Sequence, residues 1–206
     1  PERVAQAIEQ VGVGFMFAPA HHSAMKHVIT ARKEIGVRTV FNLLGPLTNP
    51  ASAPNQLMGV FDPDWIAVLL EVLKDLGSNH VMIVAADDGL DEISIASATR
   101  VGELKEGEIS IRSIAPSDFG IEQYSDYSML QIADAQESLD MLKQALTGEH
   151  RAAADIVALN AGAAIYVANL SDELAAGIDK AREIIDSGAA LDKLEELVQF
   201  TQAVDG

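Results

Sequence analysis

The sequence contains a cluster of acidic side chains that could bind a cation. Four carboxylates lie within six residues: Asp87, Asp88, Asp91 and Glu92. They directly follow the apolar segment from His80 to Ala86. Their mutual repulsion needs relief from a cation, from protonation or from solvent. Mg²⁺ on a polyphosphate is one natural occupant, because Mg²⁺ keeps its waters and takes only one or two carboxylates. A solvated turn around Gly89 explains the same pattern equally well.

A cationic side chain ends an apolar stripe in the segment 23–34, which the periodicity predicts to be a helix. The residues that share this face at helical spacing are His22, Met25, Ile29 and Arg32. Arg32 can extend to solvent or pair with an acid, which is the more common case. Alternatively, its planar guanidinium can bind a small carboxylate with two hydrogen bonds. His22 is more readily explained as a helix cap or a packed ring than as a catalytic base, and the histidines do not suggest zinc.

A loop rich in proline is the third candidate. Pro46 and Pro50 fix its backbone, and Gly45 allows another group to approach closely. A rigid turn is the simplest interpretation. However, loops that follow strands in open α/β sheets are where ligands usually bind, so Gly45 and Pro46 remain candidate site residues.

Alternating strands and helices must position these side chains. The periodicity predicts strands over 14–18, 56–61 and 80–86, and a hairpin over 100–114 with its turn at 105–107. It predicts helices over 1–11, 23–34, 63–76, 150–169 and 191–204, one that ends at Gly148, and one capped by Ser171. Such alternation predicts parallel βαβ units with helices on both faces. We therefore expect residues 1–206 to form most of one α/β domain with a mostly parallel sheet.

The amino-acid composition excludes several classes of binding partner and of functional site. The 206 residues include 31 acidic and 14 basic side chains, for a formal net charge of −17. Such acidity argues against a surface for nucleic acid or an anionic membrane, and no apolar run approaches the roughly 20 residues of a membrane span. The absence of cysteine excludes disulfides, thiolate catalysis and cysteine zinc sites. It also suits a cytoplasmic location.

Residues 38–50 resemble the anthranilate phosphoribosyltransferase family. The resemblance extends to segments 22–32, 56–60, 89–94 and 160–168, and so covers essentially the whole chain. The family transfers ribose 5-phosphate from phosphoribosyl pyrophosphate (PRPP) to the amine of anthranilate, and pyrophosphate leaves, in tryptophan biosynthesis. The resemblance implies a large α/β domain like that of nucleoside phosphorylases and phosphoribosyltransferases. It also implies a small helical domain beside it, through which the enzymes form homodimers.

The resemblance also implies roles for particular residues. Arg32 corresponds to the arginine that binds the anthranilate carboxylate, and His22, Gly45 and Pro46 correspond to residues that line the anthranilate channel. Asp91 and Glu92 correspond to the acidic pair that holds Mg²⁺ on the pyrophosphate. No residue is expected to act as a catalytic acid or base, because an arylamine is already neutral at pH 7.

The glycine-rich loops that cradle PRPP in this family are absent, and the chain opens on Pro1 without a methionine. We therefore expect the carboxyl-terminal part of such an enzyme, without the N-terminal helical domain and inactive alone. Two alternatives stay open. One is a non-catalytic relative that kept the fold and binds a ligand or partner. The other is an enzyme like the pyrimidine nucleoside phosphorylases, although these lack the block at 42–50 beside an Asp-Glu pair.

Overall fold

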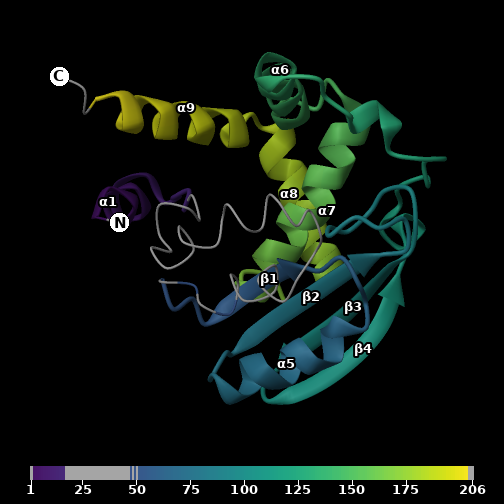
Figure 1. Ribbon diagram of the computed structural model, residues 1–206. Helices are drawn as coiled ribbons and strands as arrows, with labels where there is room; N and C mark the ends of the chain where they lie inside the picture. Colours follow the sequence, from purple (N-terminus) through teal and green to yellow (C-terminus); the bar gives the residue numbers. More distant parts are fainter. Residues whose placement is uncertain (1, 17–46, 48, 50, 204–206) are drawn as a thin grey trace, which may run out of the picture. The chain divides into compact units, whose positions relative to one another are not determined.

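The computed structural model describes residues 2–16, 47, 49 and 51–203, and Figure 1 shows their elements. The chain divides into two compact units, Pro1–Ser52 with Asp192–Gly206, and Ala53–Leu191. In the first unit, helix α1 (Glu2–Val11) buries Ala7 and Val11. The Arg3 guanidinium donates to the Phe200 carbonyl oxygen at 2.8 Å and lies over the Phe200 ring. Phe200 belongs to α9 (Ala189–Gln202), the last helix of the chain.

The second unit contains a sheet with the strand order β1-β2-β3-β4. Its strands are β1 (Asn55–Gly59), β2 (His80–Ala86), β3 (Thr99–Lys105) and β4 (Glu108–Ile114). β2 is buried along its whole length, as its apolar sequence predicts. β1 and β2 run parallel with Asn55 opposite His80, whereas β2–β3 and β3–β4 are antiparallel. The described strands therefore form a mixed sheet in place of the expected mostly parallel one.

The connections explain this mixed topology. Helix α5 (Trp65–Asp75) carries the chain from β1 across to the parallel β2. Between β2 and β3, in contrast, the segment 87–98 contains no helix, and a parallel pairing requires a crossover of that kind. β3 and β4 are joined at Glu106 and Gly107, whose φ angles of 52° and 81° suit a tight hairpin turn. This hairpin was expected at these residues.

Helices cover both faces of the sheet, as predicted, and the α/β class is confirmed. α5 packs on one face, where Ile66 and Leu70 lie against Gly102 of β3. On the other face, α7 (Arg151–Val167) contributes Leu159 and Ala163 to a core that includes Met82. α8 (Leu174–Asp186) packs against α7. Figure 1 shows α7 and α8 side by side.

The α7–α8 contact is close because glycines meet there. A Cβ on Gly162 would lie 2.4 Å from the Ile178 Cα, and one on Gly177 would lie 2.4 Å from the Gly162 carbonyl oxygen. α6 (Ala135–Leu146) packs on α7, and Asp134 caps it by accepting from the backbone N–H groups of Gln136 and Glu137. Two short 3₁₀ helices, η2 (Pro116–Phe119) and η3 (Ser128–Leu130), precede α6.

Some predicted boundaries shift. α5 begins at Trp65, because the Asp62 side chain and carbonyl accept from Asp64 and Trp65 before the helix starts. Ser171 does not cap α8, which begins at Leu174 after Glu173. Residues 14–16 are not in a strand, and the rest of that expected strand lies outside the described residues, as does the expected helix 23–34. Among the helices of the described residues, none is long and apolar enough to cross a membrane.

Candidate functional site

The acidic loop, residues 87–98, leaves the carboxyl end of β2. Its ends are tied together, because the Asp87 N–H donates to the Ala98 carbonyl oxygen at 2.9 Å. At the start of the loop, the Ala86 N–H donates to Leu90 and the Gly89 N–H donates to Ala86, with Gly89 at a φ of 90°. A tight turn therefore brings residues 91 and 92 back toward the end of the strand.

Asp88 stabilises the acidic loop through hydrogen bonds to other residues of the same loop. Its carboxylate accepts from the Ser94 hydroxyl at 2.5 Å and from the Leu90 N–H at 3.2 Å. Its own N–H donates to the Ser97 hydroxyl oxygen at 3.2 Å. Ser94 is fully buried, and its N–H donates to the Thr99 hydroxyl. The turn interpretation of the acidic cluster therefore holds for Asp88, whose charge the loop itself uses.

Asp91 and Glu92 are in a different situation. Both side chains are exposed, and within the described part of the chain neither has a hydrogen-bond or ion-pair partner. Surrounding protein atoms and then the neighbouring Asp91 carboxylate raise the pKa of Glu92 above its usual range. No protein cation relieves the repulsion between these two acids in the described structure. Within the described part of the chain, Asp88 is therefore a structural acid, whereas Asp91 and Glu92 form an acidic pair without protein partners.

Two residues from distant elements hold the backbone of this pair. Gly59, at the end of β1, lies so close that a Cβ there would be 1.6 Å from the Asp91 carbonyl oxygen. On the other side, the Asn160 side chain of α7 accepts from the Ile93 N–H at 2.9 Å and donates to the Ile93 carbonyl at 3.0 Å. Neither Gly59 nor Asn160 was among the site residues predicted from the sequence. The available signals were a glycine in a strand and one amide in an apolar helix.

The acidic pair fits a hydrated divalent cation. No group of three or more histidine or acidic side chains in the described residues could form an all-protein metal site. Two adjacent exposed carboxylates instead suit Mg²⁺, which takes one or two carboxylates and completes its coordination with waters and phosphate oxygens. The position at the carboxyl end of β2 is where open α/β sheets usually bind ligands.

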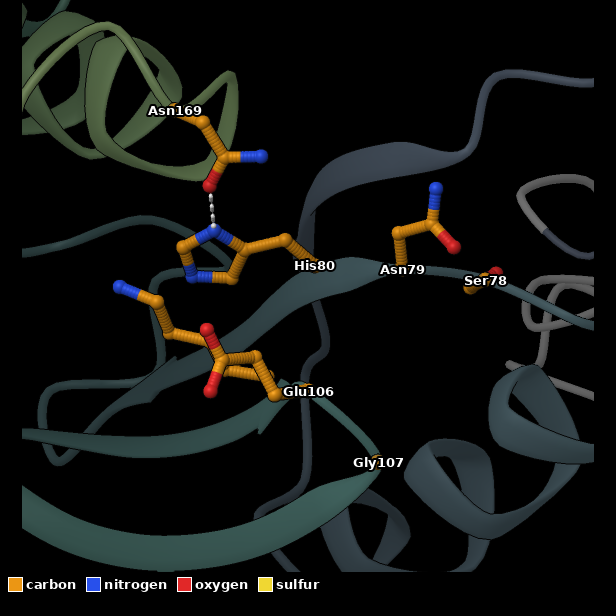
Figure 2. Close-up of a pocket in the computed structure, with 7 residues that line it drawn as sticks. Ser78, Asn79, His80, Glu106, Gly107 and Asn169 are labelled. Carbon is orange, nitrogen blue, oxygen red and sulfur yellow. Dashed lines mark hydrogen bonds between the residues drawn. The ribbon is translucent and has the colours of Figure 1, made fainter.

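A separate cavity of about 430 Å³ lies at the opposite, amino end of β2. Figure 2 shows that its walls are polar. They are formed by Ser78, Asn79, His80, Lys105, Glu106, Gly107 and Asn169. Lys105 and Glu106 place one charge of each sign in these walls.

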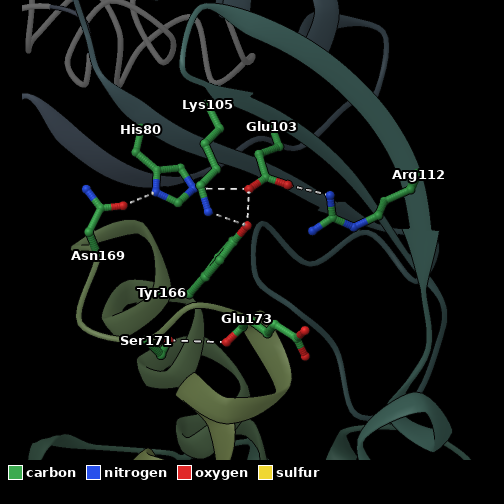
Figure 3. A network of polar contacts seen from close by, with 8 residues as sticks. All are labelled: His80, Glu103, Lys105, Arg112, Tyr166, Asn169, Ser171 and Glu173. Carbon is green, nitrogen blue, oxygen red and sulfur yellow. Dashed lines mark hydrogen bonds and ion pairs between the residues drawn. The ribbon is translucent and has the colours of Figure 1, made fainter.

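Behind this cavity a buried network joins strands to α7 (Figure 3). Its centre is Glu103, whose carboxylate accepts from the Tyr166 hydroxyl at 2.7 Å and lies 3.0 Å from His80 Nε2. Arg112 pairs with the other carboxylate oxygen at 2.5 Å. Burial alone would raise the pKa of Glu103, but hydrogen bonds from Tyr166, Arg112 and His80 outweigh it and lower the pKa. The network is therefore a satisfied structural cluster.

Of the predicted site residues, only Asp91 and Glu92 fall within the described part of the chain. Arg32, His22, Gly45 and Pro46 lie outside the described residues. The acidic loop and the amino-end cavity lie at opposite ends of β2 and do not form one site.

Comparison with known proteins defines the class first. Residues 1–191 match the family described as "Glycosyl transferase family, a/b domain". The chain belongs to this family.

More particular similarities follow. The chain is 59% identical over 201 residues to the anthranilate phosphoribosyltransferase of Thioalkalivibrio sulfidiphilus, covering 98% of this chain and 59% of that protein. The crystal structure of the Thermus thermophilus anthranilate phosphoribosyltransferase matches with a TM-score of 0.88 and 41% identity, covering 98% of this chain and 60% of that one. The Saccharomyces cerevisiae enzyme in complex with PRPP and Mg matches with a TM-score of 0.78 and 29% identity, covering 89% and 53%.

These findings confirm the resemblance to anthranilate phosphoribosyltransferases. They also show that the chain spans about 59% of the length of the curated relative from Thioalkalivibrio sulfidiphilus.

Proposed function

We propose that this chain carries the anthranilate-binding and metal-binding residues of an anthranilate phosphoribosyltransferase. The observation that carries the proposal is the backbone-anchored Asp91–Glu92 pair at the carboxyl end of β2, whose side chains have no partner among the described residues. The names of its relatives supply the acceptor, anthranilate. The yeast structure with PRPP and Mg supports PRPP as donor and Mg²⁺ as its companion ion.

The reaction joins the anthranilate nitrogen to the ribose carbon that carries pyrophosphate. The carbon–oxygen bond to pyrophosphate breaks, the leaving group takes the electron pair, and the amine nitrogen loses a proton. Bound Mg²⁺ supplies electrostatic stabilisation of the charge that develops on pyrophosphate. Asp91 and Glu92 hold that ion at the end of β2.

The acceptor side of the proposal rests on the sequence resemblance. Arg32 binds the anthranilate carboxylate through its guanidinium and orients the amine toward the ribose carbon. His22, Gly45 and Pro46 line the channel through which anthranilate enters. No side chain of the chain acts as a general base, since the arylamine attacks in its neutral form.

The proposal has an architectural part, which also rests on the resemblance. Residues 1–206 form most of the α/β catalytic domain, and a helical domain and the PRPP-cradling loops belong to the segment before it. The complete enzyme is a cytoplasmic homodimer.

The test requires a protein that contains all of these parts. We call this fusion the completed protein. It consists of the amino-terminal segment of the Thioalkalivibrio sulfidiphilus relative that this chain does not span, followed by this chain. With anthranilate, PRPP and Mg²⁺ we expect it to consume anthranilate, and we expect the 206-residue chain alone to be inactive because it lacks the donor loops.

Other outcomes would replace this proposal. A folded completed protein that leaves anthranilate untouched indicates the non-catalytic relative. Cleavage of a pyrimidine nucleoside with phosphate indicates the nucleoside phosphorylase activity. Turnover by this chain alone would contradict the division of the site between two segments.

A further inference from the structure

We infer that Asn160 positions the Asp91–Glu92 pair for metal binding. This inference rests on the proposed function of the pair, and it assigns a positioning role to a residue whose side-chain hydrogen bonds go to backbone atoms of Ile93 and Ile156. Asn160 lies in the middle of α7, 67 residues from Ile93 in sequence.

Both polar atoms of the Asn160 amide make hydrogen bonds to the Ile93 backbone. Its Oδ1 accepts from the Ile93 N–H at 2.9 Å, and its Nδ2 donates to the carbonyl oxygens of Ile93 and Ile156, each at 3.0 Å. Because one amide serves both the donor and the acceptor of the Ile93 backbone, it fixes the position and the orientation of that residue. Ile93 is 2% exposed, so loss of these bonds would leave polar backbone groups in a buried place.

The clamped residue adjoins the acidic pair. Ile93 directly follows Glu92, and Gly59 lies against the Asp91 carbonyl on the other side. The backbone of residues 91–93 is therefore held between β1 and α7, while the two carboxylates stay free of protein partners within the described residues. Two adjacent like charges repel each other. Because the backbone is fixed, their carboxylates can separate only by rotation about side-chain bonds.

The helix that carries Asn160 is itself anchored. Gly162, about half a turn further along, packs against α8 at backbone distance. Leu159 and Ala163 are fully buried. An amide placed among such apolar neighbours is costly unless it is bonded, and here two of its three bonds go to the Ile93 backbone in the acidic loop.

The test compares two α7 variants in the completed protein. Asn160→Leu keeps the branched shape and the number of heavy atoms of the side chain but removes all three bonds. We expect the Mg²⁺ concentration for half-maximal turnover to rise about tenfold or more, with the KM for anthranilate unchanged. Mn²⁺ binding in the presence of pyrophosphate, measured by electron paramagnetic resonance, should weaken by a similar factor.

Tyr166→Phe is the matched control. It removes a hydroxyl from the buried network at the other end of the same helix, so we expect it to lower stability without changing either metal measurement. If Asn160→Leu does not fold, the same measurements are made on Asn160→Ala, whose smaller side chain leaves room for water.

The outcomes separate the inference from the proposed function. Unchanged Mg²⁺ and Mn²⁺ dependence in a folded Asn160 variant would overturn the inference, as would an equal effect of Tyr166→Phe. A wild-type completed protein without turnover would overturn the proposed function, and the Mn²⁺ titration would then still decide the role of Asn160.

Discussion

Neighbouring carboxylates of the acidic loop have different roles because their surroundings differ. Asp88 accepts hydrogen bonds from Ser94 and Leu90 and holds the turn. Asp91 and Glu92 are free within the described structure, and their backbone is fixed by Gly59 and Asn160. The sequence places all these acids after a strand, but it does not show which of them the loop uses. That distinction depends on where Ser94 folds back.

Arg32 provides a prediction for the acceptor side. Arg32→Ala in the completed protein should raise the KM for anthranilate about tenfold to a hundredfold, because hydrogen bonds to a charged group contribute about 1.5–3 kcal/mol. Arg32→Lys keeps the charge but loses the planar fork, so it should restore only part of the affinity. Steady-state kinetics at saturating PRPP measure both values. An unchanged KM in the alanine variant would remove Arg32 from the site.

At the scale of elements, one buried cluster links the sheet to α7. Glu103 of β3 contacts His80 of β2, Arg112 of β4 and Tyr166 of α7. Lys105 adds a contact to the Tyr166 hydroxyl at 3.2 Å. The same helix also carries Asn160 to the acidic loop, so α7 contacts both the buried cluster and the candidate site, at different places along its length.

The lowered pKa of Glu103 predicts a pH dependence of stability. A carboxyl group with a lowered folded-state pKa stabilises the protein above its ordinary value of 4.5, and this contribution is lost as pH falls through the lowered value. Glu103→Gln should therefore cost about 2 kcal/mol at pH 7, and the difference from wild type should shrink in acid. Urea unfolding of this chain at about pH 7 and about pH 3 measures the change. A difference that grows in acid would contradict the assignment.

Local patterns predicted most elements of the second unit. The hairpin at Glu106 and Gly107, the end of α6 just before Gly148 and the buried strand β2 all follow from short-range signals. Strand direction was less predictable, because it depends on whether a connection such as 87–98 contains a crossover helix. The supports of the site were not predictable, since Gly59 and Asn160 meet the acidic loop only through long-range packing.

At the scale of the whole molecule, the net charge of the chain affects how PRPP, the proposed donor, would bind. The chain has a formal charge of −17, and PRPP is itself a polyanion, so the average field of the chain opposes their association. A divalent cation at Asp91 and Glu92 would reverse the local sign at the place where pyrophosphate must sit. Under the proposed function, Mg²⁺ at this pair would therefore reduce the repulsion between this acidic chain and PRPP.

The most direct test of this account is the Mg²⁺ dependence of anthranilate turnover by the completed protein with Asp91→Asn or Glu92→Gln. Asp87→Asn is the control, because it removes the same charge from an exposed acid of the same loop. We predict that each of the first two variants raises the half-maximal Mg²⁺ concentration by about tenfold or more, and that the control leaves it near the wild-type value. Wild-type Mg²⁺ dependence in both Asp91→Asn and Glu92→Gln would contradict the central claim that this pair holds the metal.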